Sequence, residues 1–135
     1  LNIDIDGNDY WILKELLKKI SPDVICVEHN ASFGLESIST PYKSDFDRRT
    51  EDPSNWYHGA SITAFYNLLQ SNYLLVKNIA GVNLVFVKKD KMTDRLKALT
   101  YDEAWSEPQL RNKWSGTNAK QQWDKIKHLK FELID

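Results

Sequence analysis

The sequence has little of what defines several large classes of protein. Cys26 is its only cysteine, so an intramolecular disulfide and a zinc site built from several cysteines are both excluded. Its longest uninterrupted apolar runs, such as 24–27 and 84–87, contain four residues, whereas a membrane-spanning helix needs ~20. We therefore expect no membrane partner. Met92 is the only methionine, so Leu1 is not an initiator, and we expect the chain to be a piece of a longer protein.

The chain is nearly neutral, because 18 lysines and arginines face 19 aspartates and glutamates, but the charges are unevenly spread. Acids are in excess over residues 1–58 and bases over residues 59–135. The densest basic cluster, Lys88, Lys89 and Lys91, is short and follows a predicted strand, which is typical of a solvated rim. No secretory pattern is present. We expect a folded cytoplasmic protein that binds no nucleic acid.

The first part of the sequence predicts a strand, a helix and a second strand. Residues 1–5 alternate apolar and polar side chains with the period of two of a strand. Apolar residues then recur at helical spacing over 10–20, after Asn8 and Asp9, which are good helix caps. The run 24–27 is apolar throughout, which is typical of a strand buried on both faces. Together these elements form a βαβ unit with parallel strands.

The remainder predicts a second helix, a hairpin and a helical tail. Residues 31–58 have little periodicity, and a loop of that length inside a compact domain is usually a lid or a binding segment. A helical stretch follows, and then two strand-like runs, 73–79 and 82–88, whose link is so short that they must be antiparallel. The predicted fold is therefore α/β, with an open, Rossmann-like sheet over residues 1–90 and a helical C-terminal extension, 91–135, packed on it.

Four of the five tryptophans are expected to pack inside the protein. Trp11 lies near the start of the first predicted helix, and Trp105, Trp114 and Trp123 lie in the tail. Large aromatic side chains contribute much of the energy of a core, so we expect these three to fix the tail to the sheet. Thr117 is expected to cap the last helix.

Carboxyl groups follow both predicted parallel strands. Asp4 and Asp6 share a face at the end of the first strand. Glu28 and Asn30 share a face at the end of the second, with His29 opposite. Ligands of open α/β sheets bind outside the carboxyl ends of the parallel strands, which lie ~4.8 Å apart. We therefore predict a site at which these side chains share one ion, one proton or one ligand.

Three interpretations of this cluster remain open. Carboxylate and amide oxygens suit Mg²⁺ or Mn²⁺. The same groups suit the amine and hydroxyls of a cofactor or substrate without any metal. Alternatively, Asp4 or Asp6 caps the helix that follows, and Glu28 pairs with a surface base. The run Asp4-Ile5-Asp6 also matches the short DxD motif of metal-dependent glycosyltransferases.

Four segments of the chain resemble a known family. The similarity to the C-terminal half of S-adenosylmethionine-dependent methyltransferases of the FkbM type and their relatives is carried by "IDIDGNDYWILK", "PDVICVEHNASFG", "YHGASITAFYNLL" and "GVNLVFVKKD". It covers residues 1–90 and, more loosely, the tail. It implies that the parallel strands are the fourth and fifth of a seven-stranded sheet and that the hairpin is its antiparallel sixth and seventh. The glycine-rich turn that binds the cofactor in this family would lie upstream of Leu1.

The resemblance implies roles for the residues at the strand ends. Asp4 and Asp6 would face the methionine end of S-adenosylmethionine. The catalytic candidates are Asp6, Glu28 and His29, with His29 as a base for an oxygen nucleophile. Metal-dependent O-methyltransferases hold Mg²⁺ with two acids and an asparagine, which makes Asp6, Glu28 and Asn30 a candidate site for Mg²⁺ or Mn²⁺.

Segment 31–58 would cover the substrate. The candidate substrate-binding residues are Asn30, Tyr42, Arg48 and Tyr57, because aromatic faces suit sugar rings and arginine suits acidic groups. The function that the resemblance implies is O-methylation of a small or sugar-like acceptor.

Two other functions stay open. The chain is alternatively a non-catalytic binding or assembly module with a methyltransferase-like fold, which would form a homo-oligomer through an exposed strand edge at residues 1–5. A metal-dependent glycosyl or phosphoryl transferase would instead use the pair Asp4 and Asp6.

Overall fold

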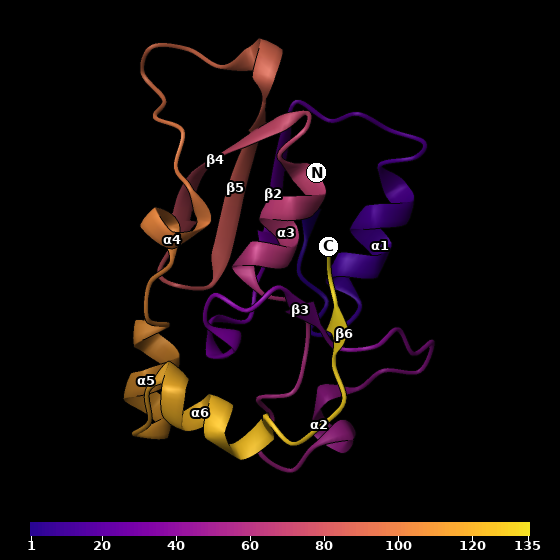
Figure 1. Cartoon of the computed structure of the whole chain (residues 1–135), viewed down its shortest axis with the longest axis vertical. Helices are drawn as coiled ribbons and strands as arrows, with labels where there is room; N and C mark the ends of the chain where they lie inside the picture. The colour runs from indigo at the N-terminus through magenta and orange to yellow at the C-terminus, as the bar shows by residue number, and fades with distance from the viewer.

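The computed structural model describes all 135 residues, and its centre is a mixed four-stranded sheet. The strands stand in the order β1-β2-β5-β4, with β1 parallel to β2 and the other neighbours antiparallel (Figure 1). Their bounds are β1 (Asn2–Ile3), β2 (Val24–Glu28), β4 (Tyr73–Ile79) and β5 (Asn83–Lys88). The prediction of an α/β fold with a parallel pair of strands and an antiparallel hairpin is confirmed at this level.

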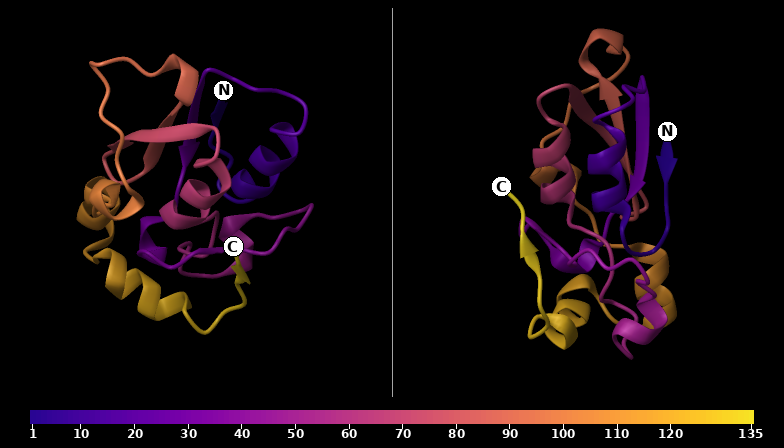
Figure 2. Two further views of the ribbon diagram at one scale, coloured as in Figure 1. Left: turned by 45° about the horizontal axis from the view of Figure 1, so that its top comes forward. Right: turned by 90° about the vertical axis from the view of Figure 1, so that its right-hand side faces the viewer.

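Two helices, α1 (Asp9–Leu16) and α3 (Ile62–Leu69), cover one face of the sheet, as the side view in Figure 2 shows. Each presents apolar side chains to it, and Leu13 of α1 and Phe65 of α3 are fully buried. Burying a side chain of this size contributes about 1.5–3 kcal/mol. The Ser61 hydroxyl accepts a hydrogen bond from the backbone N–H of Ala64 and so caps α3.

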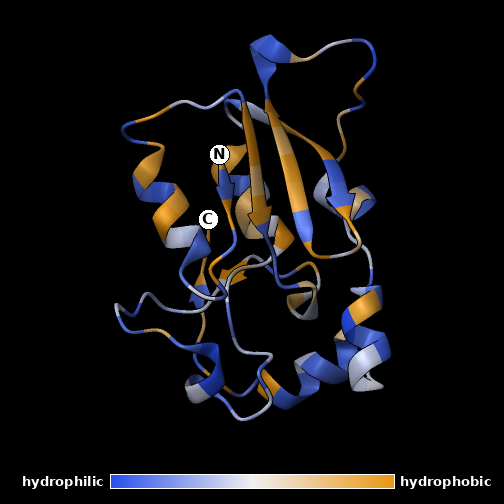
Figure 3. Ribbon diagram, turned by 180° about the vertical axis from the view of Figure 1, so that it is seen from behind, coloured by the Kyte–Doolittle hydropathy of each residue, from blue (hydrophilic) through white to orange (hydrophobic).

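The opposite face of the sheet has no helix over it (Figure 3). Along β2, Ile25 and Val27 are fully buried, whereas Val24 is 45% exposed and Cys26 is half-buried. The prediction that this strand is buried on both faces is therefore wrong for this chain. A continuous apolar run is compatible with a second covering layer but does not show that one is present.

The first strand is shorter than predicted. Only Asn2 and Ile3 pair with β2, and Ile5, expected on the buried face, is 54% exposed. The chain turns away from the sheet because the buried carboxylate of Asp9 accepts hydrogen bonds from the backbone N–H groups of Ile5 and Gly7, both at 2.9 Å. This leaves β1 as a short outer strand of the sheet.

The turn between β4 and β5 ties the hairpin to the tail. Ala80 and Gly81 both have positive φ, 56° and 73°. A Cβ atom at Gly81 would lie 2.4 Å from the carbonyl oxygen of Glu107, so only glycine permits this approach of the two segments.

The tail runs beside β4 and then beyond the ends of the strands (Figure 1). Its elements are α4 (Tyr101–Ala104), α5 (Gln109–Ser115), α6 (Ala119–Ile126) and β6 (Glu132–Leu133). Asn118 caps the last helix, so the prediction that Thr117 is the cap is wrong. The strand β6 pairs antiparallel with β3 (Ile38–Ser39), which follows the 3₁₀ helix η1 (Ala31–Phe33). The short helix α2 (Arg48–Glu51) and the 3₁₀ helix η2 (Lys89–Lys91) complete the fold.

A second apolar cluster joins segment 31–58 to the tail. Its buried members are Phe33, Ile38, Tyr57 and Ile126. It is separate from the main core under α1 and α3, which contains 15 buried residues. The long segment is therefore an ordered layer with an apolar core of its own.

The tryptophans divide into two groups. Trp11 and Trp105 pack on the main core, as predicted. Trp123 is also packed, but on the second cluster and not on the sheet. Trp114 is 77% exposed, so the prediction of a packing role for this residue is wrong. No helix is both long and apolar enough to cross a membrane, since the longest have eight residues.

Candidate functional site

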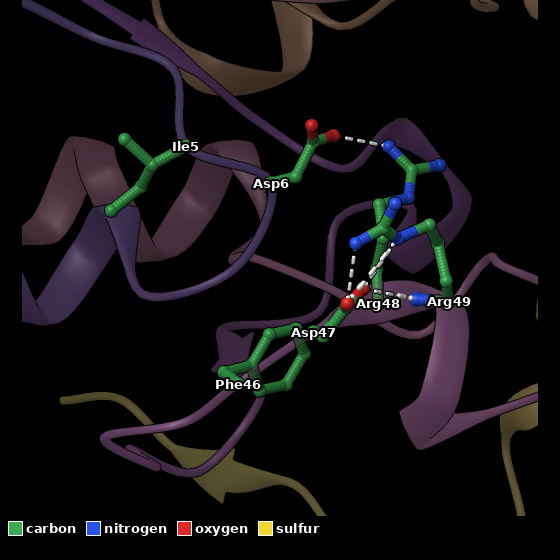
Figure 4. A pocket seen from close by; sticks show the side chains of 6 residues that line it. All are labelled: Ile5, Asp6, Phe46, Asp47, Arg48 and Arg49. Carbon is green, nitrogen blue, oxygen red and sulfur yellow. Dashed lines mark hydrogen bonds and ion pairs between the residues drawn. The ribbon is translucent and has the colours of Figure 1, made fainter.

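The carboxyl end of β2 points toward α5 and α6 (Figure 1), and β1 runs parallel to β2. Asp6 follows β1 in a left-handed backbone conformation with φ of 55°. Its carboxylate faces Arg48 of α2 and forms an ion pair with it (Figure 4). Arg48 also donates a hydrogen bond of 2.9 Å to the carbonyl oxygen of Asn55. Asp6 and Arg48 thus join the end of the first strand to segment 31–58.

The same ion pair lines an open cavity of about 390 Å³. Figure 4 shows Asp47 and Arg49 paired beside it, with Phe46 on the wall. Each guanidinium group here has a carboxylate partner, so an acidic ligand in this cavity would compete with an ion pair inside the protein.

Glu28, the last residue of β2, is 8% exposed and forms no hydrogen bond through its side chain. Its ion-pair partner is Arg111 of α5, whose Nη2 lies 3.6 Å from Oε1. Burial raises the pKa of Glu28 to about 7, and the charges of Asp4, Asp6 and Asp9 add to the rise. Arg111 acts in the opposite direction and does not cancel the rise.

Asn30 positions the segment that carries His58. Its amide nitrogen donates to the carbonyl oxygens of Trp56 at 2.6 Å and His58 at 2.9 Å. Its amide oxygen accepts from the backbone N–H of Ser32 at 3.0 Å and from Arg111 at 3.2 Å. The hydrogen bonds of the Asn30 side chain are therefore made inside the protein, where they hold the second strand end against segment 31–58.

His58 lies beside the two acids at the strand ends. One of its ring nitrogens, one oxygen of Asp6 and one oxygen of Glu28 lie within 4.8 Å of one another. The ring is 1% exposed, and its Nε2 atom has no hydrogen-bond partner. Burial, with the charges of Arg48 and Arg111, lowers the pKa of His58 well below its usual range. A neutral imidazole and two carboxylates are thus available as metal ligands.

Arg111 connects the tail to a larger cavity of about 530 Å³. Its guanidinium carbon lies 5.7 Å from the ring centroid of Trp56. Arg48, Trp56, Leu110 and Trp114 also line the cavity. Small-molecule sites measure about 300–1,000 Å³ and are mostly apolar with a few polar groups. A cavity with tryptophans and two guanidinium groups suits a small ring compound that carries an acidic group.

The structure does not bring His29 into this group. Its ring is 1% exposed and faces Asn78 of β4, with 3.4 Å between His29 Nε2 and Asn78 Nδ2. Burial and the charge of Arg111 lower the pKa of His29 to about 3. The ring therefore stays neutral and packs against the side chain of Asn78.

Three other predicted residues lie outside the cluster. The Tyr57 hydroxyl donates to the carbonyl oxygen of Lys130, and its ring lies in the second apolar cluster. Tyr42 is 58% exposed. Asp4 is exposed and forms no ion pair. The predicted residues that the structure does bring together are Asp6, Glu28, Asn30 and Arg48.

The sequence reasoning missed two members of the site, His58 and Arg111. Arg111 lies 83 positions after Glu28, and no local pattern marks it as a partner of a strand end. His58 closes the predicted lid and directly precedes Gly59, whose φ is 69°. A glycine turn at the end of a long polar segment was the one available signal, and it indicates a turn without indicating where the histidine points.

Comparison with protein-family models, with curated proteins and with solved structures finds no match to this chain. The resemblance to FkbM-type methyltransferases therefore stays a prediction from four sequence segments.

Proposed function

We propose that the chain forms the C-terminal part of an S-adenosylmethionine-dependent methyltransferase-like protein, which methylates a hydroxyl group on a small acidic ring compound. The observation that carries the proposal is the convergence of Asp6, Glu28, Arg48 and Arg111 at the carboxyl ends of a parallel strand pair. This is the end at which open α/β sheets bind their ligands, and a cavity of about 530 Å³ lies there.

The sheet supports the proposal in two ways. The parallel strands β1 and β2 and the hairpin of β4 and β5 correspond to the four strands that the resemblance implies. The uncovered face of the sheet, with Val24 and Cys26 partly exposed, suits a further layer of structure from the rest of such a protein.

The residues of this chain fit only one part of the methyl donor. S-adenosylmethionine, when bound, supplies an electrophilic methyl group, and its ammonium group is complementary to carboxylates. Asp4, which is exposed and has no ion pair, and Asp6 fit that ammonium group. None of the five glycines forms the GxG pattern of a cofactor-binding turn, so this chain offers nothing for the rest of the molecule.

The chain's own part in the reaction would be to hold the acceptor. Arg48 and Arg111 would bind its acidic group, and the ring of Trp56 would cover its apolar face. Asp6 and Glu28 would accept a hydrogen bond from the hydroxyl group that is methylated. Holding a nucleophile in line with the reacting carbon can by itself supply several kcal/mol of the rate enhancement, on the order of 7–11.

The test is transfer of a labelled methyl group to hydroxylated aromatic and sugar acids by the protein that the complete gene encodes. We expect Asp6→Asn to abolish transfer and Asp94→Asn, which changes an exposed acid far from the site, to leave it unchanged. Full activity of the Asp6 variant would remove this residue from the site. Absence of transfer to every acceptor, although the protein binds S-adenosylmethionine, would overturn the proposed function.

A further inference from the structure

We propose that Asp6, Glu28 and His58 together bind a divalent transition-metal ion, with Mn²⁺, Co²⁺ or Zn²⁺ favoured over Mg²⁺ and Ca²⁺. The proposal stands on the geometry of these three side chains and does not depend on methyl transfer. It differs from the set expected from the sequence, because His58 replaces Asn30.

Neither Glu28 nor His58 has a close side-chain partner. The Glu28 carboxyl is 8% exposed, makes no hydrogen bond, and has one ion pair, to Arg111, which is long at 3.6 Å. The His58 ring is 1% exposed, and its Nε2 has no hydrogen-bond partner. Leaving a buried polar group without a partner is costly, so an ion bound by both side chains would supply what each of them lacks.

The distances suit a single ion. Metal–ligand bonds of about 2.0–2.2 Å place two ligand atoms on one ion at most about 4.4 Å apart. The ligand atoms of Asp6, Glu28 and His58 all lie within 4.8 Å of one another, so a shift of a few tenths of an ångström closes the set. The Asp6 side chain is 55% exposed, which leaves an entry path and open coordination positions.

The two neighbouring arginines can release the acids without losing all their own contacts. Arg48 also donates to the Asn55 carbonyl at 2.9 Å, and Arg111 to the Asn30 amide oxygen at 3.2 Å and packs on Trp56. A metal ion would replace Arg48 at Asp6 and would supply Glu28 with the close positive charge that Arg111 does not reach.

The choice of metal follows from the ligands. Carboxylate oxygens alone would suit Mg²⁺ or Ca²⁺, which take almost only oxygen ligands. The imidazole nitrogen of His58 is a softer donor and favours first-row transition metals. The amide nitrogen of Asn30 donates to the carbonyl oxygens of Trp56 and His58, so Asn30 orients His58 and is not itself a ligand.

The test is titration of the chelator-treated chain with Co²⁺, followed by calorimetry and by the visible absorption of the bound ion. We expect one Co²⁺ per chain and displacement by Zn²⁺ but not by a large excess of Mg²⁺. Asp6→Asn and His58→Gln should each weaken Co²⁺ binding more than about tenfold. The matched controls Asp94→Asn and His128→Gln change an exposed acid and an exposed histidine and should leave binding unchanged.

His58 is buried, so its variant can lose its fold, whereas Asp6 is largely exposed and its variant should keep the circular dichroism spectrum of the parent. The Asp6 variant therefore decides the test. The proposal is overturned by an absence of Co²⁺ binding at millimolar concentration, by binding that Asp6→Asn leaves intact, or by equal loss in the His128 control. Metal binding without methyl transfer would leave this site standing and remove only the proposed function.

Discussion

The core under the helices and the cluster at the strand ends are held together by different means. In the core, Ile25 and Phe86 are fully buried and lie opposite each other on neighbouring strands. In the cluster, Asn30 is fully buried and Glu28 is 8% exposed, yet the contacts are hydrogen bonds and ion pairs. Apolar contacts are non-directional, whereas each polar contact needs one particular partner in one place.

The difference indicates which region stabilises the fold and which is available for binding. The core contributes free energy in proportion to the apolar area that it buries. The cluster contains a carboxyl group and an imidazole without full partners, which cost stability in the free protein. Groups kept in this condition concentrate at functional sites, because a ligand can supply what they lack.

The largest effect is expected from the core. Phe86→Ala removes a fully buried ring from the middle of the sheet and should lower the free energy of unfolding by about 3–5 kcal/mol. Urea unfolding followed by circular dichroism measures this. Leu133→Ala, at a side chain that is 85% exposed, is the control and should change the value by less than about 0.5 kcal/mol. Similar losses for both variants would mean that the core is not where the stability lies.

The next largest effect is a pH dependence of the free energy of unfolding, which arises from Glu28 in the cluster and not from the apolar core. The pKa of Glu28 is about 7 in the folded state and 4.5 in the unfolded state, so between these values the folded state binds more protons. The contribution of Glu28 to stability is thus complete below the unfolded pKa, falls as the pH rises, and is lowest above pH 7. The whole change is about 3 kcal/mol.

This pH effect is measured by urea unfolding with a chelator at pH 5 and pH 8. Glu28→Gln does not titrate, so relative to the parent it should gain about 2.5 kcal/mol between the two pH values. Glu36→Gln, at an exposed acid, should follow the parent. Parallel curves for the parent and Glu28→Gln would show that Glu28 ionises normally, and the account of the buried acid would fail.

The core was predicted better than the cluster, because core residues are marked by patterns within a few positions, whereas the cluster joins residues that are far apart in the sequence. Leu13 and Phe65 are found from helical spacing, and Ile25 from an apolar run, since each signal lies within a few residues. The antiparallel pairing of β4 and β5 likewise follows from the short link between them. The wrong prediction in the core was that β2 is buried on both faces. The apolar pattern of one strand does not show whether a second layer covers the sheet.

The cluster was predicted only where a strand end marks it. Asp6 and Glu28 follow strands, and the parallel pairing brings them together. His58 and Arg111 reach the same place through the folding of segment 31–58 and of the tail, and no periodicity describes those paths. His29 lies against Asn78 and away from the cluster, because adjacent residues of an extended segment point to opposite faces.

A smaller effect is expected at Asn30, a buried member of the cluster. Asn30→Ala leaves the carbonyl oxygens of Trp56 and His58 without their donor and should lower the free energy of unfolding by about 2 kcal/mol. It should also weaken Co²⁺ binding, because His58 is no longer held in place. The control is Asn72→Ala, at an exposed position. Loss of stability with unchanged Co²⁺ affinity would separate Asn30 from the site and assign it to the fold alone.

The smallest effect on stability is expected at Trp114, which is large and apolar but 77% exposed. Trp114→Ala should change the free energy of unfolding by less than about 0.5 kcal/mol, as at other exposed positions. Because Trp114 lines the cavity beside Arg111, the same change should weaken binding of hydroxybenzoate about threefold to tenfold. Calorimetry on Trp114→Ala and on Leu133→Ala, an exposed apolar side chain that does not line this cavity, measures the difference. Equal affinity in both variants would mean that the exposed ring of Trp114 has no part in the site, and that the cavity binds through its arginines alone.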